Sequence, residues 1–250
     1  MGNYSSKPTM PPSPPAASKE LKDPWRPVKW SEKQELLKEL EHLKPRLEPL
    51  RILVQGPVGA GKSCFINTVQ RVLLGRNVSI ALESSTTAIQ GESFTLSFNP
   101  RGPIAKDDKR YNPRPSPGDR IHCLVNIVPA DAISRLDDSV IDKMRTIRKK
   151  ASEWSIPQVI VLTKVDNACE IVSQDLRKLY HSKKVKDKVE VSSHKLGIPL
   201  NNIYPMKNYH AEITEDTNVD VLILMALRDI VNFANDYVES MYESSDCIQS

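Results

Sequence analysis

The chain has 250 residues, 39% of them hydrophobic and 26% charged, which is typical of a globular protein with one sizeable core. Its net charge of +4 is too small to indicate nucleic acid as the main partner, and no apolar run approaches the roughly 18 residues of a membrane-spanning helix. The 4 cysteines lack zinc-type and C-x-x-C spacing, so we expect free thiols and a cytoplasmic protein.

Residues 1–23 are rich in proline and serine and lack apolar periodicity, so we expect a disordered tail there. The opening MGNYSS fits the N-myristoylation pattern with Gly2 as acceptor; a tail that begins with glycine by chance is the alternative. One myristoyl chain binds membranes with an association constant of only about 10⁴ M⁻¹, so any membrane association would be weak and reversible. The prolines at 11–15 form either a spacer or a polyproline ligand.

Residues 24–46 are expected to form a lead-in helix. Ser31 and Gln34 have the spacing of a capping box, apolar residues follow at helical intervals, and Pro45 ends the pattern.

From residue 51 onward, apolar strands alternate with amphipathic helices. Strands are expected at 51–55, 93–98, 121–128, 158–163 and 202–204. Helices are expected at 62–74, 136–152, 169–181 and from a Thr217–Asp220 capping box onward. This alternation predicts a three-layer α/β domain over 47–240 with a mostly parallel sheet, followed by a disordered tail at 241–250.

Two basic segments carry two open interpretations. They are the Lys-rich stretch at 177–188 and the group Arg145, Arg148, Lys149 and Lys150. Either they contact anionic lipid or nucleic acid, or they are the solvated faces of helices with acidic residues nearby. We favour the solvated faces and predict no specific nucleic-acid binding.

A phosphate-binding loop is predicted where the first strand of the domain meets its helix. The segment GPVGAGKS at 56–63 matches G-x-x-x-x-G-K-[ST], in which glycines let backbone N–H groups surround an anion. Lys62 would reach the β- and γ-phosphates and Ser63 would bind Mg²⁺. The predicted contacts are Gly56, Val58, Gly59, Ala60, Gly61, Lys62, Ser63 and Cys64. A glycine-rich turn that binds nothing is the alternative.

A second motif, TKVD at 163–166, follows an apolar strand and resembles the [N/T]-K-x-D base-recognition motif of GTP-binding proteins. In that motif the Asp166 carboxylate would accept from guanine N1 and N2, Lys164 would lie along the ring, and Thr163 would complete the motif. Adenine would leave the carboxylate unpaired. Lys207 would supply a further backbone contact to the base. Thr86 or Thr87 would bind Mg²⁺ when a triphosphate is present; an ordinary polar loop at 84–89 is the alternative.

With these motifs in hand, the chain resembles the interferon-induced protein 44 family. The resemblance rests on the Pro24–Trp30 lead-in, RILVQGPVGAGKSCF at 51–65, DRIHCLV at 119–125, VIVLTKVD at 159–166 and NNIYPMKNY at 201–209. It implies a Ras-like G domain, GTP or GDP with Mg²⁺ as ligands, and a role in the interferon-induced antiviral response. Larger members carry an additional N-terminal domain, which we expect to be absent here.

One departure from GTP-binding proteins matters for catalysis. No aspartate of the chain has glycine three residues after it, so the D-x-x-G motif is missing, and the nearest substitute is Asn99–Gly102. The sheet is therefore expected to be one strand short, with either residues 93–98 beside the phosphate-loop strand or an open edge. We expect hydrolysis to be very slow or absent while diphosphate binding survives.

Three functional hypotheses follow. The first is a guanine-nucleotide-binding protein with weak or absent GTPase activity. The second is a nucleotide-independent, membrane-associated interaction protein whose phosphate loop is a relic. The third is an ATP-using kinase or ATPase, for which Asp131 offers an alternative Mg²⁺ ligand.

Overall fold

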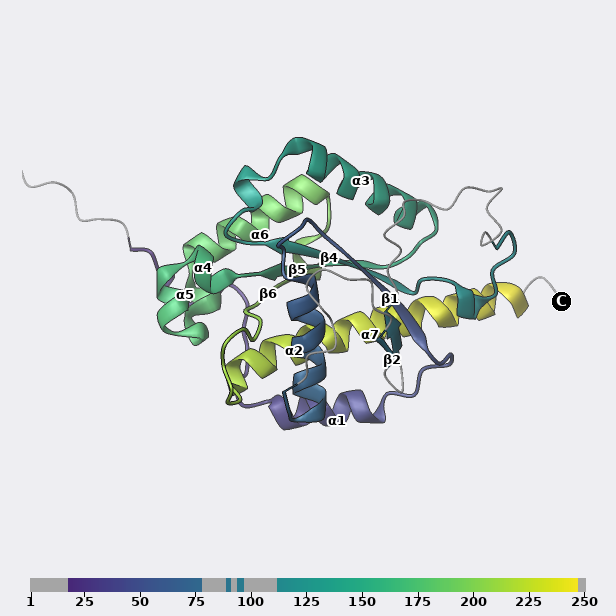
Figure 1. Cartoon of the computed structure of the whole chain (residues 1–250), viewed down its shortest axis with the longest axis horizontal. Helices are drawn as coiled ribbons and strands as arrows, with labels where there is room; N and C mark the ends of the chain where they lie inside the picture. Colours follow the sequence, from purple (N-terminus) through teal and green to yellow (C-terminus); the bar gives the residue numbers. More distant parts are fainter. Residues whose placement is uncertain (1–17, 78–88, 91–93, 97–111, 247–250) are drawn as a thin grey trace, which may run out of the picture.

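A computed structural model describes residues 18–77, 89–90, 94–96 and 112–246 of the chain (Figure 1). Gly2, the prolines at 11–15, Thr86, Thr87 and Asn99–Gly102 lie outside these residues. No helix in the described ranges has both the length and the apolar character needed to cross a membrane.

The centre of the domain is one six-stranded sheet with the order β2-β3-β1-β4-β5-β6. Its strands are β1 (Leu50–Gln55), β2 (Ile89–Gln90), β3 (Phe94–Leu96), β4 (Cys123–Pro129), β5 (Gln158–Thr163) and β6 (Ile203–Pro205). β3, β1, β4, β5 and β6 run parallel, and β2 pairs antiparallel with β3. The central strand β4 is buried throughout, as expected for a strand covered on both faces. The predicted α/β fold is confirmed.

The edge of the sheet beside β1 resolves the two alternatives left by the sequence. β3 pairs in parallel with β1, with Leu50 opposite Phe94 and Arg51 opposite Thr95. β3, which lies within the strand predicted at 93–98, is therefore the neighbour of the phosphate-loop strand, and β2 adds a further strand that sequence patterning did not predict. The expected shortage of one strand is not seen, although β2 and β3 have only 2 and 3 residues.

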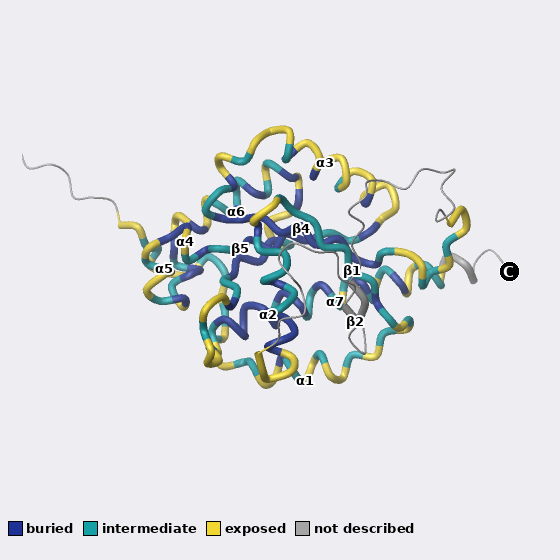
Figure 2. Tube along the Cα trace, in the orientation of Figure 1, coloured by how far each residue is buried: buried dark blue, intermediate teal, exposed yellow. Residues whose placement is uncertain are grey.

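Helices cover both faces of the sheet (Figure 1). The α-helices are α1 (Lys33–His42), α2 (Lys62–Leu74), α3 (Asp138–Glu153), α4 (Val165–Ala168), α5 (Glu170–Gln174), α6 (Lys183–Leu196) and α7 (Thr217–Asp246). The 3-10 helices are η1 (Pro117–Asp119), η2 (Ile133–Arg135), η3 (Leu176–His181) and η4 (Leu200–Asn202). α3 and α6 pack together on one face, while α1 and α2 pack on α7 on the other. The buried residues follow the sheet and the inner sides of these helices (Figure 2).

Several predicted helix boundaries are corrected. α1 begins at Lys33 after Glu32, with no side-chain cap, so the Ser31–Gln34 capping box is wrong. At the start of α7 the Asp216 carboxylate, not Thr217, accepts from the Asn218 N–H at 2.9 Å. The single helix expected over 169–181 is instead α5 and η3, because Asp175 between them has extended backbone and caps η3.

The Lys-rich stretch at 177–188 spans most of η3 and the beginning of α6, which is an amphipathic helix. Ser182 caps it by accepting from the Val185 N–H at 3.1 Å. Val185 and Val189 are buried, whereas Lys183 and Lys184 are exposed. This geometry matches the solvated-face interpretation of the lysines.

Both predicted tail boundaries are displaced. The Leu21 N–H donates to the His181 carbonyl at 2.7 Å and the Trp25 N–H to the Tyr180 carbonyl at 3.0 Å, so ordered chain begins before residue 24. Arg26 then donates to the carbonyls of Leu200 and Ile203, both at 2.8 Å, and ties this lead-in to the start of β6. At the other end, α7 continues to Asp246, past the boundary predicted at 240.

Candidate functional site

The phosphate loop joins the carboxyl end of β1 to α2, and its shape requires glycine at defined positions. A Cβ on Gly56 would stand 2.2 Å from the backbone oxygen of Ile127 in β4, and φ there is +154°. Gly61 has φ of +93°, in the region that side chains rarely adopt. The glycines thus bring the loop backbone against β4 and turn it into the helix.

The Lys62 side chain folds back over this loop. Its Nζ donates to the carbonyl oxygens of Gly56 at 3.0 Å and Pro57 at 2.9 Å. Partial burial lowers the pKa of Lys62 because the charged ammonium is desolvated. Its bonds in the described structure go to neutral carbonyls, so the ammonium keeps a net positive charge at the loop. An anion in the loop would stabilise that charge.

A buried amide ladder supports the strand ends below the loop. Gln55, which precedes Gly56, donates from Nε2 to Oδ1 of Asn126 at 2.6 Å. Asn126 is 1% exposed and donates from Nδ2 to the Val159 carbonyl at 3.0 Å. These bonds link β1, β4 and β5 where the strands approach the site, which adds register specificity to the backbone pairing.

The second motif lies directly beside the phosphate loop. Thr163 ends β5 and is fully buried, and its Oγ1 donates to the Ala60 carbonyl at 2.6 Å. Lys164 follows with φ of +59°, an uncommon conformation for a lysine, and precedes α4. Asp166 lies in the first turn of α4. A residue 103 positions away in the chain is therefore hydrogen-bonded to the phosphate loop.

The loop after β6 completes the other side of the site. Asn208 donates from Nδ2 to the Gly61 carbonyl at 3.4 Å, and its Oδ1 is buried with no hydrogen-bond partner among the residues that the structure describes. A buried acceptor without a donor is costly, so this oxygen is suited to accept from a bound ligand. Beside it, Lys207 Nζ lies 2.6 Å from Glu212 Oε1. Burial lowers the pKa of Lys207, but the bond to Glu212 and the negative charges of Glu212 and Asp166 outweigh burial and raise it.

The sequence of this chain is similar to the sequences of several known proteins. No protein-family model matches it. Human interferon-induced protein 44 is 30% identical over 241 residues, which cover 78% of this chain and 54% of that protein. Human interferon-induced protein 44-like is 26% identical over 239 residues, covering 77% and 53%. The mouse interferon-induced protein 44 is 27% identical over 254 residues, covering 82% and 60%.

The chain is a relative of interferon-induced protein 44. It spans about half the length of the curated relatives it matches. Among solved structures it is similar to Toc33 from Arabidopsis thaliana in complex with GDP and Mg²⁺, at 16% identity and a TM-score of 0.46 over 83% of this chain and 92% of that one. A probable GTP-binding protein engB is 13% identical, with a TM-score of 0.41 over 74% and 99%.

In this relative of interferon-induced protein 44, the structure gathers most of the predicted site residues at the carboxyl edge of the sheet. The phosphate-loop residues from Gly56 to Cys64 border Thr163, and the 206–208 segment contacts Gly61. Asp166 lies close enough to Lys207 for its charge to raise the pKa of that lysine. The structure does not place Thr87, the second predicted Mg²⁺ ligand, because it lies outside the described residues.

The donors of the site suit a phosphorylated ligand better than a metal held by protein alone. The Lys62 ammonium lies over the loop at the start of α2, where the N-terminus of the helix also favours negative charge. Within the described ranges, no group of three or more histidine, cysteine, aspartate or glutamate side chains is placed to hold a metal ion. Ser63 in the first turn of α2 is the predicted Mg²⁺ ligand that the structure places.

Sequence patterning missed the side chains that hold the loop after β6. Neither the buried acceptor on Asn208 nor the contacts of Arg71, Tyr209 and Glu212 belong to a motif. Thr68 and Arg71 have the i, i+3 spacing of one helix face, which was the one sequence feature that pointed to a shared role.

Proposed function

We propose that this chain binds a guanine nucleoside diphosphate or triphosphate with Mg²⁺. The proposal depends on one observation: the Thr163 hydroxyl donates to the Ala60 carbonyl at 2.6 Å, which fixes TKVD against the phosphate loop. A phosphate held at the loop and a base held near Asp166 would then belong to one ligand. The juxtaposition also supports guanine over adenine, because an adenine would leave the Asp166 carboxylate without its paired donors.

Each residue has a defined task in the proposed complex. The backbone N–H groups of the phosphate loop, of which Pro57 has none, would surround the phosphates, and Lys62 would exchange its two carbonyl partners for phosphate oxygens. The Ser63 hydroxyl is the protein's ligand to Mg²⁺, which would neutralise phosphate charge when bound. Lys164 and Lys207 flank the base, the first along its ring and the second through its backbone N–H. The orphaned Oδ1 of Asn208 supplies a further acceptor.

Hydrolysis is proposed to be very slow or absent. Fast hydrolysis requires groups that stabilise charge on the transferred phosphoryl and position the attacking water. The chain lacks D-x-x-G, and no glutamine or arginine is evident in that role, so we assign no catalytic residue. We therefore propose that the site binds the nucleotide without hydrolysing it rapidly. The bound nucleotide would then control an interaction with protein partners.

The names of the relatives support a biological setting. The name that interferon-induced protein 44 and its 44-like counterpart share supports a role for this chain in an interferon-induced response. We further propose that this role is part of an immune or antiviral response and that the chain acts in the cytoplasm. Weak membrane association through a lipidated Gly2 is part of the same proposal. Gly2→Ala should abolish that association, and membrane partition unchanged by the substitution would contradict it.

The direct test is titration of the purified chain with fluorescent GDP, GTP and ATP in the presence of Mg²⁺. Lys62→Ala and Asp166→Ala should each weaken GDP binding by roughly tenfold to a hundredfold, the effect of losing one charge-assisted contact. Lys183→Ala and Asp142→Ala remove the same charges from exposed positions on the opposite helical layer and should change nothing. A folded protein that binds none of the three nucleotides would overturn the proposal, and preference for ATP would favour a kinase or ATPase.

A further inference from the structure

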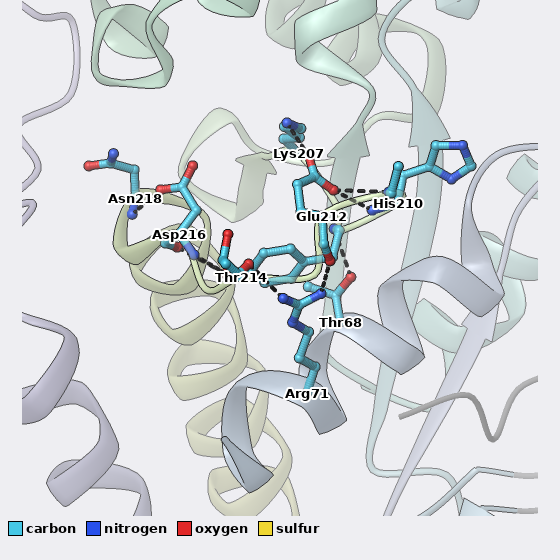
Figure 3. Close-up of polar contacts among 10 residues, drawn as sticks. Thr68, Arg71, Lys207, His210, Glu212, Thr214, Asp216 and Asn218 are labelled. Carbon is cyan, nitrogen blue, oxygen red and sulfur yellow. Dashed lines mark hydrogen bonds and ion pairs between the residues drawn. The ribbon is translucent and has the colours of Figure 1, made fainter. Parts of the chain in front are cut away.

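The loop between β6 and α7, residues 206–216, is bound to the helix that begins at the phosphate loop; we term it the base loop (Figure 3). The Tyr209 N–H donates to Thr68 Oγ1 at 3.1 Å. Two guanidinium nitrogens of Arg71 donate to the carbonyls of Glu212 and Thr214, each at 2.6 Å. Both Thr68 and Arg71 belong to α2. The same rigid helix therefore carries Lys62 at one end and holds the base loop about two turns later.

Arg71 is a buried cation that contacts the base loop through its guanidinium group. Arg71 is 8% exposed, and its guanidinium carbon lies 3.9 Å from the centroid of the Tyr209 ring. A planar guanidinium can stack on the ring and donate to two carbonyls at once, which a lysine ammonium cannot do in the same geometry. Burying a charge is costly unless it is well bonded, so these contacts are required for Arg71 to occupy this position.

Glu212, which accepts from Arg71, also pairs with Lys207, the lysine proposed to contact the base. While the Glu212 carbonyl accepts from Arg71, its carboxylate accepts from the N–H groups of His210 at 2.8 Å and Ala211 at 3.1 Å and pairs with Lys207 at 2.6 Å. Glu212 thus links Arg71 on one side to Lys207 on the other. Lys207 is in turn within electrostatic range of Asp166.

The far end of the base loop is fixed by Tyr209. Its hydroxyl donates to Asp220 Oδ1 at 2.7 Å and accepts from the Asp216 N–H at 2.6 Å. Because the ring of Tyr209 also lies against Arg71, one guanidinium contacts Tyr209, Glu212 and Thr214 of the base loop. Loss of Arg71 would remove these three contacts and leave the Thr68 bond as the remaining side-chain tie named here between α2 and the loop, without altering any residue of the phosphate loop.

We propose that Arg71 is a positioning residue that sets the base loop relative to the phosphate loop and so determines affinity for the base of the nucleotide. The inference rests on the proposed guanine-nucleotide binding. It adds a residue outside both sequence motifs, with an effect on the base half of the ligand alone. Pyrophosphate, which contacts only the phosphate loop, separates the two halves.

The test compares Arg71→Lys and Arg71→Met with the unaltered full-length chain in GDP, ADP and pyrophosphate titrations with Mg²⁺. Each substitution should weaken GDP binding about tenfold and lower the preference for GDP over ADP, while the affinity for pyrophosphate stays within about twofold. Arg76→Met, at an exposed position just after the same helix, is the matched control and should leave all three affinities unchanged. Equal weakening of GDP and pyrophosphate, or no change in either, would overturn the inference.

A second measurement needs no nucleotide. Backbone amide hydrogen exchange of residues 206–216 should accelerate about tenfold in Arg71→Lys, while exchange in β4 and β5 stays unchanged. Exchange that accelerates across the whole domain would show a general folding role, and unchanged loop exchange would show that Arg71 does not hold the loop. An unaltered chain that binds no guanine nucleotide overturns the proposed function; a chain that binds GDP but keeps its selectivity in both Arg71 variants overturns this inference alone.

Discussion

The two sides of the candidate site are held by different kinds of interaction. The phosphate loop depends chiefly on its own glycines: Gly56 and Gly61 have backbone conformations that residues with side chains rarely adopt, and the missing Cβ lets Gly56 lie against β4. The base loop takes its shape from partners far away in the chain, with Arg71 141 residues before Glu212 and Lys33 182 residues before Glu215. A site can therefore be half local and half tertiary, and substitutions should affect the two halves through different mechanisms.

The sharpest test of the local half is Gly56→Ala, for which we expect the largest effect. A Cβ there would meet the Ile127 backbone oxygen at 2.2 Å, so either the loop or β4 must move. We expect the free energy of unfolding to fall by about 3–4 kcal/mol, together with loss of nucleotide binding. Urea denaturation followed by circular dichroism measures the first effect, and GDP titration the second.

Gly59→Ala is the matched control within the same loop. A Cβ at Gly59 would have no heavy atom of the described residues within 4 Å, but φ of +74° still disfavours a side chain. The expected loss of stability is about 1 kcal/mol, the cost of the left-handed conformation alone. Equal losses in the two variants would mean that contact with β4 does not determine the shape of the loop.

This contrast also explains what the sequence could predict. GPVGAGKS and TKVD were recognisable because each carries its geometry in consecutive residues, and apolar strands such as 158–163 were predicted with their observed bounds. The clamp around Arg71 was not predictable, because burial of an arginine depends on which carbonyls the fold brings to it. β2 was missed for a related reason, since 2 residues carry no recognisable alternation.

Helix ends show the same limitation at smaller scale. Thr217 and Asp220 have the spacing of a capping box, but Asp220 is 1% exposed and receives Tyr209 Oη and Lys33 Nζ instead. The Asp220 carboxylate therefore binds Tyr209 and Lys33 instead of capping α7, and the Asp216 carboxylate caps the helix. Spacing alone cannot reveal that competition.

Lys33→Met tests the tertiary half, with the second largest expected effect. Lys33 Nζ lies 2.7 Å from both Asp220 and Glu215, and its removal leaves the Asp220 carboxylate buried with one fewer partner. We expect the free energy of unfolding to fall by about 2–3 kcal/mol, because an uncompensated buried charge costs more than the pair itself contributes. Urea denaturation at pH 7 measures the loss.

The control for that substitution is Lys29→Met. The Lys29 side chain is 82% exposed and pairs with Glu32 on the surface, so the same chemical change should leave the free energy of unfolding almost unchanged. Similar losses in the two variants would contradict the view that the Lys33 pair anchors the base loop. Phosphate-loop geometry should be intact in both, which pyrophosphate affinity would report.

The smallest predicted effect concerns the pH dependence of the base loop. Burial would raise the pKa of Glu212, but the bonds from Lys207 and the His210 N–H outweigh it and lower the pKa from the usual 4.5 to about 2. A carboxyl with a lowered pKa stabilises the folded state above its unfolded pKa, and that stability disappears as the pH falls toward the folded value. Glu212→Gln should therefore be less stable than the unaltered chain at pH 7, by no more than about 1 kcal/mol because the side chain is partly exposed.

The difference in the free energy of unfolding between Glu212→Gln and the unaltered chain is more informative than the pH dependence of either protein alone. It should stay constant from pH 7 to about 5 and shrink between about pH 4.5 and 2, as the unaltered Glu212 becomes protonated in both states. Other carboxyl groups titrate alike in both proteins, so subtracting urea unfolding curves at each pH isolates this one. A difference that does not depend on pH would mean that Glu212 acts through its shape and not through its charge, and its ion pair with Lys207 would then contribute nothing to stability.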